Sequence, residues 1–212
     1  MQPPTAPRAH RDRAVVDDKC RRRFDPHVKP LNELAEEISK TTEKPTPWFD
    51  PDGGGIHARA LFLLETPGRQ AGGDQGSHFI SADNDDPTAE NFFRIRDEVG
   101  LPRDSLVAWN VVPWYLGDLT RGANATTADI KEARPWLERL IRLLIPDLRV
   151  VVPMGGKALN GWMLLLATDL SIPLLPTLAL PHPSPKVLNT HPEQRGVIRS
   201  GLQRVTDIVN PG

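Results

Sequence analysis

Four short apolar runs, each closed by a turn with proline or glycine, constrain the fold of this chain more than any other feature. The runs are residues 60–64, 106–109, 150–152 and 177–180. They are short and continuously apolar, which favours strands buried on both faces. Stretches with a helical spacing of apolar residues separate or follow them, at residues 88–99, 127–144, 156–167 and 195–209. This alternation predicts an α/β domain with a mainly parallel central four-stranded sheet and helices on both faces.

The composition predicts one globular domain preceded by an arm. With 212 residues, 39% apolar and 25% charged, the chain resembles ordinary soluble proteins. Residues 1–24 are rich in arginine and proline and have no apolar period, so we expect a flexible basic N-terminal arm before a domain at residues 25–212. No apolar run approaches the ~20 residues of a membrane span, and the start lacks an apolar signal core. We therefore expect a cytoplasmic monomer with no membrane partner.

The charge and the cysteine content narrow the chemistry. Cys20 is the only cysteine, which excludes an internal disulfide and a cysteine-held zinc or iron–sulfur site within one chain. We expect no metal and no other cofactor. The net charge is -1, so the chain is not a polycation that collects on nucleic acid. Any contact with DNA would need a local basic strip.

Polar residues follow the apolar runs. Glu65, Thr66 and Gly68 come after the first run, Asn110 after the second and His182 after the fourth. In open α/β sheets, ligands bind outside the carboxyl ends of the strands. The topology therefore predicts that these side chains meet in one crevice.

Taken in order, these segments resemble the uracil-DNA glycosylase superfamily over residues 58–209. Residues 65–68 are similar to its first motif, in the Gly-Glu-Ala-Pro-Gly form of the iron–sulfur branch. Phe79 matches the aromatic residue on which the extruded uracil stacks, and Asn110 matches the asparagine that reads the uracil edge. Residues 182–184 match the His-Pro-Ser motif, whose histidine assists departure of the base. The resemblance implies hydrolysis of the N-glycosidic bond of uracil, or a related deaminated base, in DNA during base-excision repair.

The chemistry of these side chains fits the roles that the resemblance implies. An amide such as that of Asn110 can pair with O4 and N3–H of uracil at once. A hydrogen bond from His182 to O2 would stabilise the departing base. Phe79 could stack on the flipped base, although a plain core phenylalanine explains it equally well.

The residue that activates water is open. Thr66 stands where the best-known branch has a catalytic aspartate, and its hydroxyl cannot act as a base near neutral pH. Gly68 replaces a tyrosine that excludes thymine. Asp83, Asp85 and Glu65 are the candidates for the base, and we rank Asp83 first. The other interpretation of the acidic segment around Asp83 is a solvated loop or the N-cap of the next helix.

The segment after His182 is predicted to face DNA. Ser184 belongs to the motif loop, Leu188 would supply an apolar wedge, and Lys186 and Arg195 would meet phosphates.

Two other functions stay open. The first is a catalytically reduced member of the superfamily that binds DNA or a nucleobase, which Thr66 favours. The second is a nucleotide-phosphate binder that uses residues 155–157 at a helix start, although this segment lacks the P-loop spacing.

Overall fold

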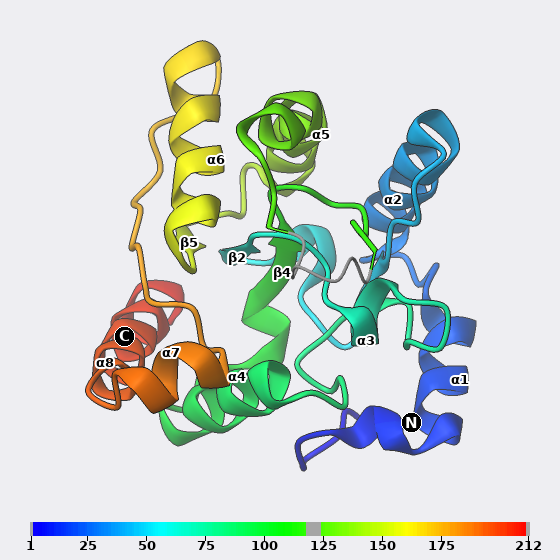
Figure 1. The fold of residues 1–212 in the computed structure, drawn as a ribbon, viewed down its shortest axis with the longest axis vertical. Helices are drawn as coiled ribbons and strands as arrows, with labels where there is room; N and C mark the ends of the chain where they lie inside the picture. Colours follow the sequence, from blue (N-terminus) through cyan, green and yellow to red (C-terminus); the bar gives the residue numbers. More distant parts are fainter. Residues whose placement is uncertain (1, 118–123, 211–212) are drawn as a thin grey trace.

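A three-stranded parallel sheet in the order β4–β2–β5 forms the centre of the molecule (Figure 1). The computed structural model describes residues 2–117 and 124–210. In chain order the elements are η1 (Ala9–Arg11), α1 (Arg13–Arg22), α2 (Lys29–Thr42), β1 (Trp48–Phe49), η2 (Gly55–His57), β2 (Ala60–Leu64), α3 (Arg69–Gly72), β3 (Phe79–Ile80), α4 (Pro87–Glu98), η3 (Arg103–Ser105), β4 (Leu106–Asn110), α5 (Thr127–Leu144), β5 (Val150–Pro153), α6 (Gly156–Thr168), α7 (Pro185–Thr190) and α8 (Gln194–Val209).

Helices cover both faces of this sheet, as predicted. Because side chains alternate along a strand, Leu61 and Leu63 of β2 pack into a cluster with α2, α5 and α6. Ala60 and Phe62 point the other way and pack with α4 and α8. Figure 1 shows α5 and α6 on one side of the strands and α4 and α8 on the other. The α/β class and the parallel strands are therefore confirmed.

The prediction of a single four-stranded sheet is wrong. Residues 177–180 make only two isolated bridges to β5, and β1 pairs with β3 in a separate two-stranded parallel sheet. Pro153 explains the interruption. The backbone of β5 exchanges bonds with residues 176–180 on either side of this proline. Pro153 itself has no N–H to donate, so the ladder breaks between the bridges.

The N-terminal segment also differs from expectation. Its described part, residues 2–24, forms η1 and α1, with Asp12 capping α1 through a 2.9 Å bond from the Ala14 N–H. Lys19 of α1 is fully buried inside the domain. The prediction of a flexible arm is therefore wrong for these residues. The arm lacks an apolar period because ion pairs, not an apolar stripe, hold it in place.

None of the described helices has the combination of length and apolar character that a membrane span requires.

Candidate active site

A cavity of about 380 Å³ lies between the strands, α4 and the loops at the carboxyl ends of β2 and β4. Its lining includes Thr66, Gly68, Asn110 and His182, which come from three of the predicted strand ends. The apolar part of its wall consists of residues such as Phe62, Leu64, Phe92, Ala108 and Met154. A mostly apolar cavity with a few polar groups is the usual form of a small-molecule site.

Three residues that line the cavity have a buried polar atom without a hydrogen-bond partner among the described residues: Asn110 at Oδ1, Asp52 at Oδ2 and Arg96 at Nε. Asn110 is the uncharged one. It ends β4 opposite Leu64 and is 3% exposed. The backbone bonds continue the pairing past it, from Val111 N to the Leu64 carbonyl at 2.9 Å. Its side-chain Oδ1 is buried without a hydrogen-bond partner among the described residues. A buried unsatisfied acceptor costs about 1–3 kcal/mol, and a ligand N–H would remove that cost.

His182 is held at the cavity by its neighbours. The Asn91 amide of α4 donates to the Pro183 carbonyl at 2.9 Å, and two prolines restrict the backbone on either side of the histidine. Burial lowers the pKa of His182 below its usual value. Its ring is therefore neutral at physiological pH and can donate one N–H without carrying charge.

Gly155 lies next to the side chain of His182. Its φ of 93° is in a region that other residues rarely adopt, and a Cβ built there would lie 3.4 Å from Cβ of His182. We predict that Gly155→Ala lowers the free energy of unfolding by about 1–3 kcal/mol. Gly156→Ala is the matched control, because a Cβ at Gly156 meets nothing within 4 Å. Thermal unfolding of both variants checks this, and equal stability of the two would contradict it.

The first motif divides into lining and supporting residues. Thr66 and Gly68 line the cavity, and Gly68 leaves its wall open, since a Cβ there would meet nothing within 4 Å. Glu65 does not line it. The Glu65 carboxylate accepts a hydrogen bond from Ala125 N at 2.7 Å, so it anchors the segment that leads into α5. Glu65 therefore holds a neighbouring segment in place and does not itself face the cavity.

Phe79 lies behind the cavity wall. It is fully buried, and its ring centroid lies 5.6 Å from that of Trp48 and 6.4 Å from that of His10. The structure therefore does not offer its face to a base, in contrast to the sequence prediction. Phe62 and Phe92 do line the cavity, with centroids 5.1 Å apart in an edge-to-face arrangement.

Asp83 is not free to act as a base. It is fully buried and lies outside the cavity lining. Its Oδ2 accepts from Lys19 Nζ at 2.6 Å and from Arg103 Nη1 at 2.8 Å, and Arg103 Nη2 binds Oδ1. The sequence prediction that ranked Asp83 first is therefore wrong. It failed because the cations that pair with Asp83 come from elsewhere in the chain, Lys19 from the N-terminal segment and Arg103 from η3, and no local pattern predicts these contacts.

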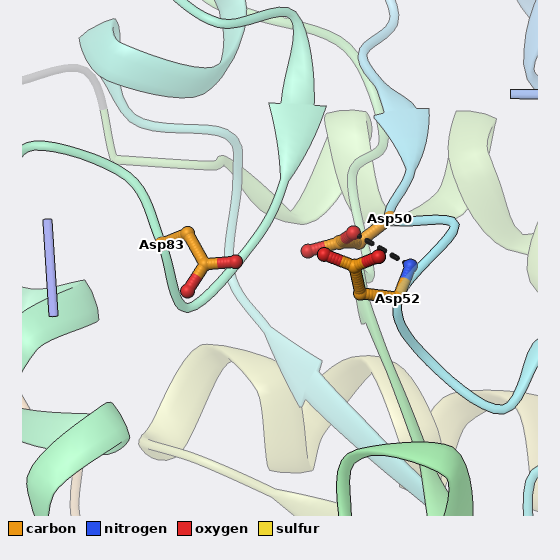
Figure 2. A group of neighbouring side chains, drawn as sticks. All are labelled: Asp50, Asp52 and Asp83. Carbon is orange, nitrogen blue, oxygen red and sulfur yellow. Dashed lines mark hydrogen bonds between the residues drawn. The ribbon is translucent and has the colours of Figure 1, made fainter. Parts of the chain in front are cut away.

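Asp83 belongs to an acidic cluster that includes Asp50 and Asp52, whose carboxylates face one another in Figure 2. Three such groups could hold a metal ion, but the Lys19 ammonium lies among them. Its Nζ is 2.7 Å from Asp50, 3.1 Å from Asp52 and 2.6 Å from Asp83. A divalent cation would have to displace this fixed positive charge. We therefore interpret the cluster as an internal ion-pair network.

Lys19 also favours the ionised form of Asp50. Burial opposes the ionisation of Asp50, but the charge and hydrogen bond of Lys19, with a 2.5 Å bond from Ser81 Oγ, outweigh it. Together they hold the pKa of the Asp50 carboxyl well below its usual range. Asp50 and Arg103 line the cavity, so the network forms part of its wall.

The residues predicted to face DNA are only partly available. Lys186 is exposed in the first turn of α7, two residues after Ser184, which directly precedes that helix. Leu188 is half-buried against the α4–α8 core and does not project as a wedge here. Arg195 is paired with Glu98.

Comparison with known proteins agrees with the geometry. A family model described as the uracil DNA glycosylase superfamily matches residues 51–201. The chain belongs to this superfamily. The resemblance found in the sequence is thus confirmed, and the matched segment contains both Asn110 and His182. Helix α1, with Lys19, lies outside it.

A solved structure resembles the fold. SMUG2 of Pedobacter heparinus superposes with a TM-score of 0.52 at 13% identity, covering 87% of this chain and 86% of that chain. At this identity the likeness concerns the fold alone. A comparison with curated proteins found no match. The superfamily assignment places the chain among DNA glycosylases, which are hydrolases of DNA repair.

Proposed function

We propose that this protein flips uracil, or a related deaminated base, out of DNA and hydrolyses its N-glycosidic bond in base-excision repair. The unpaired Oδ1 of Asn110 carries the proposal. A buried acceptor at the end of a cavity requires an N–H from whatever fills it. N3–H of uracil supplies one, whereas cytosine has no hydrogen on N3.

The remaining groups complete the reaction. A base in the duplex is out of reach, so extrusion precedes chemistry and costs a few kcal/mol. His182 donates its N–H to the O2 of the leaving base as negative charge develops there. Lys186 contacts a phosphate near the extruded nucleotide, with Ser184 at the same loop, and Arg195 would contribute only after leaving Glu98.

Cleavage of defined oligonucleotides tests the proposal. Single- and double-stranded substrates that carry uracil, hypoxanthine, xanthine or a thymine mismatch are incubated with the protein, and abasic sites are detected by strand scission in alkali. We expect cleavage at uracil or at a related deaminated base. No cleavage of any substrate at high enzyme concentration would overturn the proposal.

Base selectivity gives a sharper prediction. Asn110→Ala removes the only amide placed in the cavity by β4, and we expect the preference for uracil over cytosine to fall about 10- to 100-fold, corresponding to 1–3 kcal/mol. Competition between the two substrates measures this ratio. Asn160→Ala, on the exposed side of α6, is the control and should leave the ratio unchanged. If this ratio is unchanged in Asn110→Ala, Asn110 does not distinguish uracil from cytosine.

A second function follows from Thr66, which lines the cavity where a carboxylate would be expected to activate water. A catalytically reduced member of the superfamily would bind uracil-containing DNA in preference to undamaged DNA without cleaving it. Binding measured by fluorescence anisotropy, in parallel with the cleavage assay, separates the two functions.

A further inference from the structure

Aspartates near the cavity differ in whether a cation lies against them. Lys19 binds Asp50, Asp52 and Asp83, as described above. Asp52 is also bound by Arg22 at 2.8 Å, and the second oxygen of Asp50 accepts the Asp52 N–H at 2.9 Å. Carboxylates neutralised in this way are poor proton acceptors. Asp52 Oδ2 makes no hydrogen bond with the described residues but lies 3.1 Å from the Lys19 ammonium, so each of the three carboxylates has a cation against it.

Asp86 is different. It lines the cavity and is the N-cap of α4, where its Oδ1 accepts both the Thr88 N–H at 2.8 Å and the Ala89 N–H at 2.9 Å. Its Oδ2 forms no hydrogen bond with the described residues. One oxygen therefore fixes the carboxylate in place, and the other is available to a molecule in the cavity.

The direction of α4 brings Asp86 to the reactive end. Residues 99–105 join the end of α4 to the start of β4, and Arg96 Nη1 donates to the Leu101 carbonyl in this connection at 2.9 Å. Phe92 and Ile95 of α4 pack in the same cluster as Leu106 of β4. The two elements thus run in opposite directions, and the N-terminus of α4 lies at the carboxyl end of β4, with Asn110. Asn91, about one and a half turns after Asp86, binds the Pro183 carbonyl next to His182. Asp86 therefore shares one end of the cavity with both.

We propose that the Asp86 carboxylate is the group that takes a proton from the attacking water, a role that rests on the proposed function. The water oxygen bonds to C1′ of the sugar as the bond from C1′ to the base nitrogen breaks. The electron pair of that bond leaves with the base, whose O2 accepts the His182 hydrogen bond. The water proton passes to Oδ2 of Asp86 and then, through solvent, to the departed base.

The surroundings of Asp86 suit a base. Burial raises the pKa of its carboxyl, against the two backbone hydrogen bonds and Arg8, which lower it, while Asp85 raises it further. A higher pKa makes the carboxylate a better proton acceptor. The reaction needs the ionised form, so the rate should fall as the pH drops through a pKa above that of an ordinary aspartate.

Asp86→Asn tests the assignment, because asparagine can still cap α4 and so preserves the fold. Single-turnover cleavage of a uracil oligonucleotide is measured over a range of enzyme concentrations and pH values. We expect the maximal rate to fall about 100-fold or more. The enzyme concentration at half-saturation should not change, and the acid-side fall in rate should disappear.

Asp85→Asn is the matched control. Asp85 adjoins Asp86 in sequence but pairs with Arg8 at 3.2 Å and Arg11 at 2.9 Å, outside the cavity lining. It should cleave at close to the wild-type rate at neutral pH and keep the acid-side fall, shifted to slightly lower pH because Asp85 no longer raises the pKa of Asp86. An Asp86→Asn protein as fast as wild type, or one that keeps the acid-side fall, overturns the role of Asp86 alone. If the wild type and Asp85→Asn also cleave nothing, the proposed function fails, and the role of Asp86 fails with it.

Discussion

Replacing His182 by alanine should lower the single-turnover rate of uracil release by about 100-fold or more. A fixed donor aimed at developing charge in a water-poor site contributes about 3 kcal/mol, and each 1.36 kcal/mol is a factor of ten in rate. His182 is such a donor: it lines the cavity, and its loop is fixed by Asn91 and by prolines on either side. The expected loss is in the chemical step, so the affinity for uracil-containing DNA should change little.

His191→Ala is the control for this experiment. His191 follows α7, its side chain is exposed, and its imidazole lies 3.5 Å from Glu193 rather than near the cavity. The pH dependence adds a second test. Since burial lowers the pKa of His182 and the neutral ring is the donor, the rate should stay level as the pH rises through about 6.5. A rate that falls there would show that the cationic ring is required, and a wild-type rate in His182→Ala would exclude the histidine from the reaction.

Lys19→Met should destabilise the protein by about 3–5 kcal/mol, the typical effect of removing one partner from a buried ion pair. Lys19 is fully buried, and Asp50 depends on it as its closest cation. Methionine fills most of the volume but leaves the carboxylates without their central charge. Chemical denaturation at neutral pH measures the loss. Lys29→Met, which removes an exposed lysine 3.7 Å from Glu33, should change the stability by no more than about 0.5 kcal/mol.

The sign of the pH dependence separates this explanation from a simple packing defect. In the wild type the lowered pKa of Asp50 gives stability that is present above the usual aspartate pKa of about 3.9 and is lost as the pH falls through the folded-state value. In Lys19→Met, burial without a counter-ion should raise that pKa above the unfolded value. The folded variant then binds more protons, so its stability should rise as the pH falls from neutral. A fall in both proteins would contradict the role of Lys19.

The ion-pair network around Lys19 could not be predicted from the sequence, whereas other parts of the site could. The sequence predicted that Asn110 and His182 lie at one crevice, because residues that follow parallel strands lie at the carboxyl end of the sheet, and both line one cavity. The acidic segment was also predicted to hold the N-cap of the next helix, and in the structure Asp86 is that N-cap. Its sequence neighbour Asp83 ranked higher as a base. Nothing local to residues 81–86 distinguishes an aspartate neutralised by a distant lysine from one that is free.

The sequence by itself determined the α/β class, the parallel strands, the superfamily and the end of the sheet that carries the site, because these depend on periodicity and on the order of motifs along the chain. The tertiary structure decided which carboxylates lie against a cation and that Phe79 lies behind the cavity wall. It also decided that residues 177–180 form two isolated bridges, interrupted at Pro153, and not a fourth strand. These depend on contacts between segments far apart in the chain. The reach of Lys19 to Asp50 and Asp83 is the clearest case, because a buried charge is positioned by its partners and leaves no periodic trace in the sequence.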